Sequence, residues 1–562
     1  MFWILTAATL LRMFGLTWGL PASDGWDDDG VAPRNFLVGV VQTFAPGSYF
    51  TYPPLHMILL MALTLPGWLL ALHSAHSHAR QDVIAAFIQV PYMTFFAVVA
   101  RAVSIAMSVA TIFMVGRMTM VIAGRRAGLA AAAACTLNAT LTYYGQVTNL
   151  DGPYLFWSVL ALWGWMRLVA ERELRHLRWA MLATVAAIAT KDQAYALFLL
   201  GLPALLLLWF GLDPWARNNA RAIVPRLLVW AGIALLALLA IDGALTNPAG
   251  FAKRIAFLTG PASQDYAQYQ ADLRGRLSLL QDAWAYFPRS YPAAAAGLGV
   301  MGIALHLGRH RDRPQLLVAG LLPLLAMVSF TLAFNLVALR SENRFLLPQS
   351  VLMACYIGIA VDRVAFAARL WVRYPGRVLI FGIALAAFCR CAAIDAAIAG
   401  DPRYDAERWM AAALRPGDRI EAYGLNTFLP RFPAMAVVTR LDRKPLALRN
   451  PLPHVTELDQ PFQSVTTRNP RFLVVNGFWV KGYLQRALTP PGDGRITQET
   501  QQALFRETAT AHYFTSLFDD ELPYRLVHIS SYRPQFWPAV DGYESLAQNI
   551  FIFERTDVPH RP

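Results

Sequence analysis

Several charged residues of this chain stand beside long apolar stretches, where charged side chains are rare. An acidic cluster, "WDDDG", follows an opening run rich in Leu, Phe, Met and Trp, and a single aspartate stands in "NLDGPY". A lysine–aspartate pair stands in "ATKDQAY", and two arginines flank a glutamate in "RSENRFLLP". Because an ionised side chain at the bilayer centre costs about 2.5–3.5 kcal/mol on insertion scales, such residues usually mark a functional or paired site. The residues concerned are Asp24, Asp27, Asp28, Asp29, Asp151, Lys191, Asp192, Arg340, Glu342 and Arg344.

These residue types suit one kind of chemistry in particular. Carboxylates that face a cavity at membrane level can act as a general base toward an acceptor hydroxyl or amine. Arginine and lysine near the lipid headgroups can hold a phosphate that becomes the leaving group. Together they indicate group transfer from a lipid phosphate to an acceptor. A sugar is the expected group, because a polyprenyl-phosphate sugar needs no nucleotide outside the cell.

Each group of residues also has a structural interpretation. The aspartate cluster can be a solvated loop, and Asp151, followed by Gly-Pro, can cap a helix. Lys191 and Asp192 can neutralise each other in a tight turn, and Arg344 can reach the lipid headgroups along its aliphatic stem. The functional interpretation therefore depends on all of these groups lying on the same side of the membrane.

The composition is that of a membrane protein. Of 562 residues, 56% are hydrophobic and 15% are charged, and the mean hydropathy is +0.38. Soluble proteins are typically about 45–50% apolar and about 25% charged. Long apolar runs recur from the N-terminus to about residue 398 and then stop. We therefore expect a polytopic membrane domain at 1–398 and a more polar domain at 399–562.

The formal net charge of +13 is concentrated in short breaks between the apolar runs. Lys and Arg outnumber Asp and Glu in these breaks taken together, which is typical of loops on the cytoplasmic side of a membrane. This distribution argues against a nucleic-acid partner. The breaks are 124–126, 171–178, 213–226, 308–313 and 362–377.

The apolar runs predict eleven membrane-spanning helices, since a span needs roughly 20 residues. With the basic breaks in the cytoplasm, the outward-facing parts are the loops 21–92, 147–153, 244–290 and 336–344, the turn at 191–195 and the C-terminal domain. The run 55–72 would invert every later loop if it crossed, so we expect an interfacial or re-entrant helix there. The expected spans are 1–20, 93–122, 127–146, 154–170, 180–191, 195–212, 227–243, 291–307, 315–335, 345–361 and 378–397.

The C-terminal part predicts a small α/β domain. "DRIEAYG" and "RFLVVNGFWV" indicate strands, and "YDAERWMAAALR" and "TQETQQALFRETATAHYF" have helical spacing. The four cysteines all lie in apolar runs, with spacings that indicate neither zinc ligands nor a disulfide framework.

An ordered set of motifs resembles the membrane glycosyltransferases of the GT-C fold. The closest resemblance is to the dolichyl-phosphate-mannose protein mannosyltransferases and the bacterial aminoarabinose transferases of lipid A. The matching stretches run over about residues 8–360: "LRMFGLTWGLP", an acidic pair, "YPPLHMILL", "GRRAGLAAAAACTLNATLTYYGQVTNLDGPYLFWSVLALW", "ATKDQAYALFLLGLP" and "ENRFLLP".

The resemblance implies roles for particular residues. The family has Asp-Glu in its first outer loop, with the aspartate as proposed base, and this places the base at Asp28 or Asp29 with Gly30 where the glutamate is expected. Asp151 matches a second outer-loop acid. Lys191 and Arg344 match elements that would contact the donor phosphate, with Arg340 beside them. Further candidates for the site are Asp27, Tyr52 of "YPPL", Asp192 and Glu342.

The combined interpretation is an inner-membrane (plasma-membrane) GT-C glycosyltransferase with eleven spans and an extracytoplasmic α/β domain. Its partners would be a polyprenyl-phosphate sugar donor, membrane lipid and an acceptor that is a glycan, a lipid or a protein. The residues require no cofactor, and they leave open whether a divalent cation takes part. The alternatives are a transporter or flippase for a lipid-linked sugar, and a catalytically inactive family member.

Overall fold

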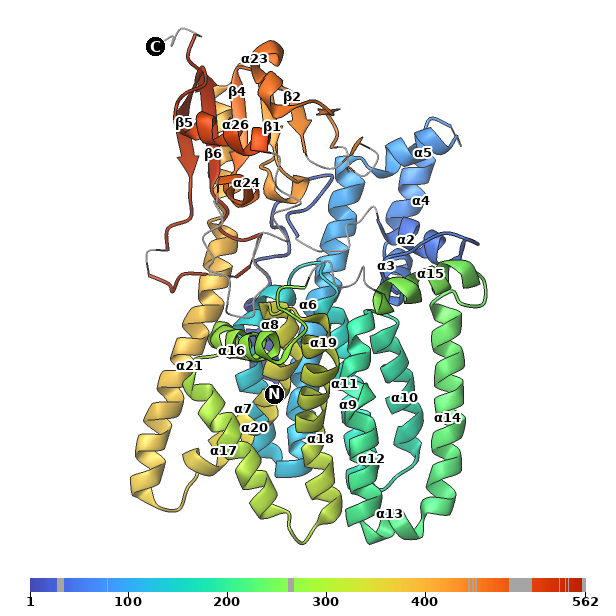
Figure 1. The fold of residues 1–562 in the computed structure, drawn as a ribbon. Helices are drawn as coiled ribbons and strands as arrows, with labels where there is room; N and C mark the ends of the chain where they lie inside the picture. The colour runs from blue at the N-terminus through green and yellow to red at the C-terminus, as the bar shows by residue number, and fades with distance from the viewer. Residues whose placement is uncertain are drawn as a thin grey trace. The chain divides into compact units, whose positions relative to one another are not determined.

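The computed structural model is mostly helical, with one β-sheet near the C-terminus (Figure 1). It describes residues 1–27, 35–77, 79–260, 267–442, 445–446, 449, 452–484, 508–534, 536–540, 542–543 and 545–557. The predicted fold class, an all-α polytopic part followed by a small α/β domain, is confirmed.

The chain divides into two compact units, each assembled from separate segments. The first unit comprises residues 1–16, 34–65 and 99–394, and the second comprises 17–33, 66–98 and 395–562. The chain passes from the first unit to the second after residue 394, which is close to the expected domain boundary at 398. The second unit also takes in segments of the first outer loop, 21–92.

The helices up to the second unit's sheet follow one another with short breaks. They are α1 (Phe2–Leu10), α2 (Asn35–Phe44), α3 (Leu55–Leu63), α4 (Leu65–Ser74), α5 (Arg80–Phe87), α6 (Val90–Ala123), α7 (Arg125–Thr136), α8 (Ala139–Tyr144), α9 (Asp151–Glu171), α10 (Arg175–Ile188), η1 (Asp192–Ala194), α11 (Tyr195–Leu199), α12 (Gly201–Leu212), α13 (Pro214–Asn218), α14 (Ala220–Ile241), α15 (Pro248–Thr259), α16 (Leu273–Ser290), α17 (Ala294–Arg309), α18 (Pro314–Phe330), the π-helix η3 (Thr331–Asn335), α19 (Leu336–Ala338), η4 (Asn343–Leu346), α20 (Leu347–Ala365) and α21 (Leu370–Ala399).

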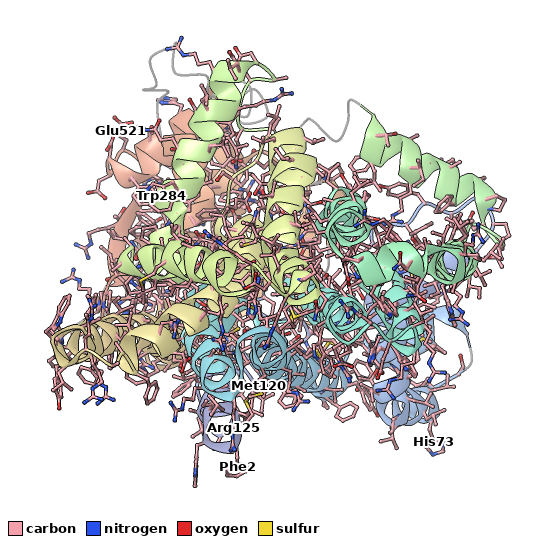
Figure 2. All side chains as sticks on the ribbon, turned by 90° about the horizontal axis from the view of Figure 1, so that it is seen from below. Phe2, His73, Met120, Arg125, Trp284 and Glu521 are labelled. Atoms are coloured by element: carbon pink, nitrogen blue, oxygen red, sulfur yellow. The ribbon has the colours of Figure 1, made fainter. Side chains whose placement is uncertain are left out.

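The apolar helices make this a multi-pass membrane protein. Within the described residues, six helices are long and apolar enough to cross a membrane, or eight if each of two bent pairs counts as one span. Exposed apolar side chains, as expected of a surface that faces lipid, support this conclusion. In the most apolar window of α14 only 11% of residues are buried. Phe2 is 71% exposed and points outward from the bundle (Figure 2). The basic joints α12–α14, α17–α18 and α20–α21 lie at one end of the bundle in Figure 1. This is expected of basic loops that all face the same side of the membrane.

The expected count of eleven spans is not confirmed. The run 1–20 is helical only over Phe2–Leu10, and the run 127–146 is divided between α7 and α8. That division has a local cause, because the side chain of Asn138 accepts the backbone N–H of Leu141 at 2.8 Å and caps α8. The run 55–72 forms α3 and α4, bent by 65°, a geometry that suits a broken span or a re-entrant loop alike. The interfacial interpretation of that run stays a prediction.

Close helix packing in the first unit depends on small residues. A Cβ atom on Gly302 of α17 would lie 1.9 Å from the carbonyl oxygen of Tyr356 in α20. A Cβ atom on Gly358 would lie 2.6 Å from the carbonyl oxygen of Ala127 in α7. Small residues are what allow helix backbones to approach in a membrane, where no hydrophobic effect drives helices together.

The second unit contains a six-stranded sheet in the order β3-β2-β1-β4-β6-β5. Strands β3, β2, β1 and β4 are parallel, whereas β6 runs antiparallel to β4 and to β5. The strands are β1 (Arg419–Tyr423), β2 (Val437–Leu441), β3 (Val455–Leu458), β4 (Phe472–Asn476), β5 (Tyr524–Ser530) and β6 (Ile550–Arg555), and the helices of this part are α22 (Pro402–Ala413), α23 (Val465–Arg468), α24 (Gly477–Leu484) and α26 (Thr508–Phe518).

Both faces of the sheet are covered by helices, so successive strand residues enter different cores. Phe472 and Val474 pack with Met410 of α22, whereas Leu473 and Val475 pack with Phe514 of α26. The predicted strands in "DRIEAYG" and "RFLVV" are confirmed. The "GFWV" that continues the second one is helical, as the start of α24.

The sidedness of the chain can be tested by thiol labelling in intact cells. We expect a membrane-impermeant maleimide to label Thr466→Cys in the C-terminal domain and His76→Cys in the first outer loop. Arg311→Cys, in a basic joint, should react only after the membrane is permeabilised. Labelling of Arg311→Cys alone in intact cells would contradict the predicted orientation.

Candidate functional site

Asp151 is the most buried of the predicted site residues and forms the centre of a polar cluster in the first unit. It begins α9 and is fully buried. Its Oδ1 accepts hydrogen bonds from Lys191 Nζ at 2.7 Å and from Gln193 Nε2 at 2.9 Å. Its Oδ2 is buried and has no hydrogen-bond partner among the described residues. A buried polar atom without a partner needs an explanation, and a ligand group is one of the ordinary ones.

Lys191 lies in the turn between α10 and η1, with an extended backbone that ends the helix. Its ammonium group pairs with Asp151 and lies 5.8 Å from the ring centre of Tyr154, a fully buried residue of α9. The hydroxyl of Tyr154 has no hydrogen-bond partner among the described residues either. The predicted lysine and the second outer-loop acid thus meet across 40 residues of sequence.

Asp192 belongs to a second charged cluster, centred on Arg254 of α15. Arg254 is 1% exposed and bonds both carboxylate oxygens of Asp192, and its other terminal nitrogen lies 3.9 Å from Asp242 Oδ2. Asp242 directly follows α14, and burial raises its pKa to about 7. The cluster therefore ties η1, α14 and α15 together.

The arginines of "RSENRFLLP" form a separate cluster with their own glutamate. Glu342 lies 2.8 Å from Arg344 Nε and 4.0 Å from Arg340. Both guanidinium groups lie over the ring of Phe345, at 4.9 and 5.5 Å. Arg289 of α16 brings a third guanidinium group to the cluster by donating to Asn343 at 3.2 Å.

The π-helix η3 connects the lysine turn to this arginine cluster. The hydroxyl of Tyr195, four residues after Lys191, donates to the carbonyl of Ala333 at 3.1 Å. Asn335 donates to the carbonyl of Phe345 at 3.2 Å and accepts from Gln349 at 2.9 Å. Single π-helical turns inside α-helices are frequent at functional sites, because they re-aim nearby side chains.

The acidic outer loop is only partly described. Asp28 and Asp29, the predicted base candidates, lie outside the described residues. Asp24 and Asp27 belong to the second unit, where Asp24 accepts from Asn426 at 3.3 Å and Asp27 is 9% exposed. Tyr52 is partly buried and stands just before α3, in the first unit.

Sequence reasoning missed several members of the site. Tyr154 stands three residues after Asp151, a spacing that suggests a shared helix face. Gln193 stands two residues after Lys191, and that spacing gives no such signal. Asp242 lies at the end of the expected span 227–243, and Arg254 lies in the expected outer loop that follows it. Asp242 directly follows α14 and Arg254 lies inside α15, and their spacing of twelve residues gives no local signal that they pair.

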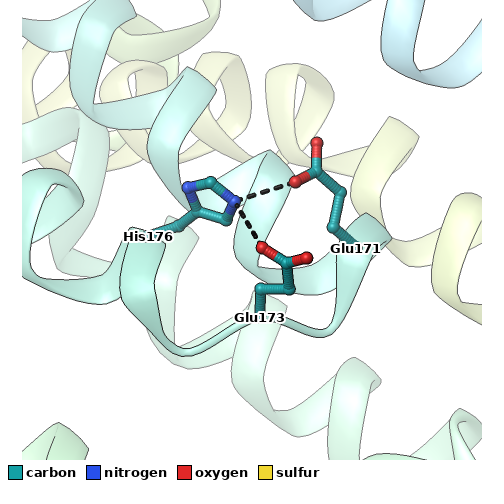
Figure 3. A group of neighbouring side chains, drawn as sticks. All are labelled: Glu171, Glu173 and His176. Atoms are coloured by element: carbon teal, nitrogen blue, oxygen red, sulfur yellow. Dashed lines mark hydrogen bonds and ion pairs between the residues drawn. The ribbon is translucent and has the colours of Figure 1, made fainter.

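Among the described residues, one group has the composition of a metal site, and it contains none of the predicted site residues. Glu171, Glu173 and His176 gather where α9 meets α10, in a basic joint (Figure 3). His176 Nε2 lies 2.8 Å from Glu171 and 3.5 Å from Glu173. Arg167 bonds both oxygens of Glu171, and Arg175 pairs with Glu173. The carboxylates are thus already neutralised by arginine.

Comparisons with known proteins give a likeness in structure only. No protein-family model matches the chain, and no curated protein is significantly similar to it. ArnT from Cupriavidus metallidurans, solved apo and bound to undecaprenyl phosphate, has a TM-score of 0.49 and 14% identity in both states, over 98% of this chain and 97% of ArnT. The oligosaccharyltransferase AglB from Archaeoglobus fulgidus, in complex with an inhibitory peptide and a dolichol-phosphate, has a TM-score of 0.48 and 13% identity, over 99% of this chain and 88% of AglB.

Both are GT-C fold glycosyltransferases. Aminoarabinose transferase is also one of the two groups that the ordered motifs resemble. TM-scores below 0.5 and identities of 13–14% do not decide the reaction of this chain. Its function has to follow from its own residues.

The ion pair at the site's centre predicts a specific pattern of stability. Lys191→Met should lower the melting temperature of the purified protein, because it leaves Asp151 buried without a cation, which costs about 3–5 kcal/mol. Adding Asp151→Asn should recover part of that loss. Arg167→Met is the matched control, since exposed pairs such as Arg167–Glu171 contribute only about 0.3–0.5 kcal/mol. Equal losses for Lys191→Met and Arg167→Met would contradict the buried pair.

Proposed function

We propose that this protein is a membrane glycosyltransferase that moves a sugar from a polyprenyl-phosphate donor to an acceptor on the outer face of the inner (plasma) membrane. The observation that carries the proposal is the fully buried Asp151 with one oxygen paired to Lys191 and Gln193 and the other unpaired. A carboxylate held in this way is oriented and charged, and it keeps one free oxygen for a hydroxyl or amine. The acceptor or the sugar of the donor supplies such groups.

The arginine cluster suits the donor phosphate. Arg340 and Arg344 both pair with Glu342, and guanidinium groups held in this way suit the oxygens of a phosphate, which they can bind with two parallel hydrogen bonds. Lys191 is the third predicted phosphate contact. Its pairing with Asp151 means that it would serve the phosphate and the carboxylate together, and so link the donor side of the site to Asp151.

The reaction itself requires a base toward the acceptor. In the proposed step the acceptor oxygen or nitrogen attacks the anomeric carbon, the bond from that carbon to the phosphate oxygen breaks, and the acceptor proton passes to a carboxylate. Asp28 or Asp29 is the proposed base, with Asp27 next to them in the chain and Asp151 orienting the reactants. By resemblance to the family, one direct displacement would invert the anomeric centre.

The other candidates have supporting positions. Asp192, through Arg254, fixes the turn that carries Lys191, and Glu342 holds its two arginines. Tyr52 precedes α3, whose first residue, Leu55, bonds the carbonyl of Ala189 next to the same turn at 3.0 Å. The acceptor is a glycan, a lipid or a protein, and a divalent cation stays an open requirement.

The proposal is tested with purified protein, a radiolabelled polyprenyl-phosphate sugar and a membrane extract as the source of acceptor. We expect sugar transfer by the wild type and a loss of about 10²–10⁴-fold in at least one of Asp28→Asn and Asp29→Asn, the usual contribution of a general base. Asp151→Asn should also slow transfer. Asp312→Asn, an exposed acid of a basic joint, is the matched control and should have wild-type activity.

The same assay separates the alternatives. Undiminished transfer by both Asp28→Asn and Asp29→Asn would refute the proposed base. Movement of the lipid-linked sugar across vesicles without transfer would identify a transporter instead. Neither transfer nor movement, with the donor still bound, would identify an inactive member of the family.

A further inference from the structure

Residues 18–26, at the end of the expected first span and the start of the first outer loop, are built into the second unit by two tryptophans. Trp18 and Trp26 are each 1% exposed, and their rings meet edge to face at 6.1 Å. Trp26 immediately precedes the three aspartates of "WDDDG". Buried tryptophans contribute some of the largest contact areas of any side chain, so they fix the segment that carries them.

Arg403 of α22 holds both tryptophans. It is fully buried, and it donates to Asp401 through Nε at 2.8 Å and through Nη2 at 2.6 Å. The same guanidinium also bonds the carbonyl oxygens of Thr427 and Ser545. Its face lies 4.1 Å from the ring centre of Trp26 and 5.2 Å from that of Trp18. The planar group is therefore bonded at its edge and stacked on its face, a geometry that lysine cannot reproduce.

Hydrogen bonds from the loop complete the attachment. Trp18 donates to Asp401 at 3.0 Å, Trp26 donates to the carbonyl of Leu429 at 3.1 Å, and Gly19 donates to the hydroxyl of Tyr404 at 2.9 Å. Asn426 donates to Asp24 at 3.3 Å. These four bonds join residues 18–26 to the C-terminal part of the second unit, and the backbone N–H of Ala22 also donates to the hydroxyl of Thr94 in α6 at 3.1 Å.

The place of attachment is the carboxyl-end edge of the parallel strands. Residues 426–429 follow β1 directly, and Asn476, at the end of β4, donates to the carbonyl of Phe428 at 2.9 Å. Connections leave β1 and β4 in opposite directions along the sheet order, and at such a point doubly wound sheets usually bind their ligands. In this chain, residues 18–26 occupy that edge.

We propose that the C-terminal domain uses this edge to dock residues 18–26, and that Arg403 is a positioning residue for sugar transfer, because it fixes the segment from which the chain continues into the acidic cluster. The second half of this inference rests on the proposed function, and the docking does not. A base displaced by about 1 Å loses up to about 10²-fold in rate, so a residue far from the sugar can control the chemical step.

The test combines local accessibility with kinetics. A thiol introduced by Ala22→Cys, in the docked segment, reports docking through its rate of reaction with a maleimide. We expect Arg403→Lys, which keeps the charge, to raise that rate about tenfold through local opening. In the assay of transfer, Arg403→Lys should lower kcat by about 10- to 100-fold and leave the KM for the donor nearly unchanged.

Two further variants make the result decisive. Trp26→Phe keeps most of the packing and loses the hydrogen bond to Leu429. It should therefore raise the labelling rate and lower kcat, each by less than Arg403→Lys does. It takes the place of Arg403→Lys should that variant fail to fold. Arg471→Lys is the matched control: Arg471 pairs with Asp418 and Glu554 in the same domain, and neither readout should change.

The outcomes separate the two claims. Unchanged labelling of the Ala22→Cys thiol in Arg403→Lys would overturn the docking. Faster labelling with unchanged kcat would overturn the positioning role. A wild type without any transfer would overturn the proposed function and the positioning role with it, and the labelling would still decide the docking.

Discussion

A carboxylate buried among apolar helices is stabilised by a nearby cation, and the pair of Asp151 and Lys191 meets this requirement at one end of a helical hairpin. Asp151 begins α9 and Lys191 follows α10, so the 2.7 Å contact closes the hairpin at that end. Asp192, the next residue, reaches Arg254 and through it Asp242, so the same turn also fixes α14 and α15. The turn at Lys191 and Asp192 therefore holds Asp151, Asp242 and Arg254 in place.

In the second unit, the segment that leads into the acidic cluster packs against the C-terminal part of the chain. Residues 18–26 gain their core from Arg403, Tyr404 and the segment after β1. Residues 18–26 thus contact the edge of the sheet at which doubly wound domains often bind a ligand. The sheet serves as a support for another part of the same chain.

Patterns that depend on local sequence were predictable, and those that depend on distant partners were not. Hydropathy located most helices of the first unit, and short runs of apolar residues located β1 and β4, because a buried segment shows its character in its own residues. The charges of Asp151, Lys191 and Arg344 stood out because their neighbours are apolar. Arg403 and Arg254 did not, since a buried arginine is recognisable only by what it touches. The predicted number of spans is not confirmed, because a helix break inside an apolar run is hard to see in the sequence. Asn138, which caps α8, is such a break.

The attachment of Trp18 to Asp401 has a consequence for biosynthesis, since 383 residues separate the two. At about 5–20 residues per second, the ribosome needs roughly 20–80 s to synthesise that interval after Trp18 has been made. During this time the membrane helices insert while the acidic loop has no dock. Residues 18–26 therefore gain this support only after residue 401 has been synthesised, and chains that terminate earlier lack it.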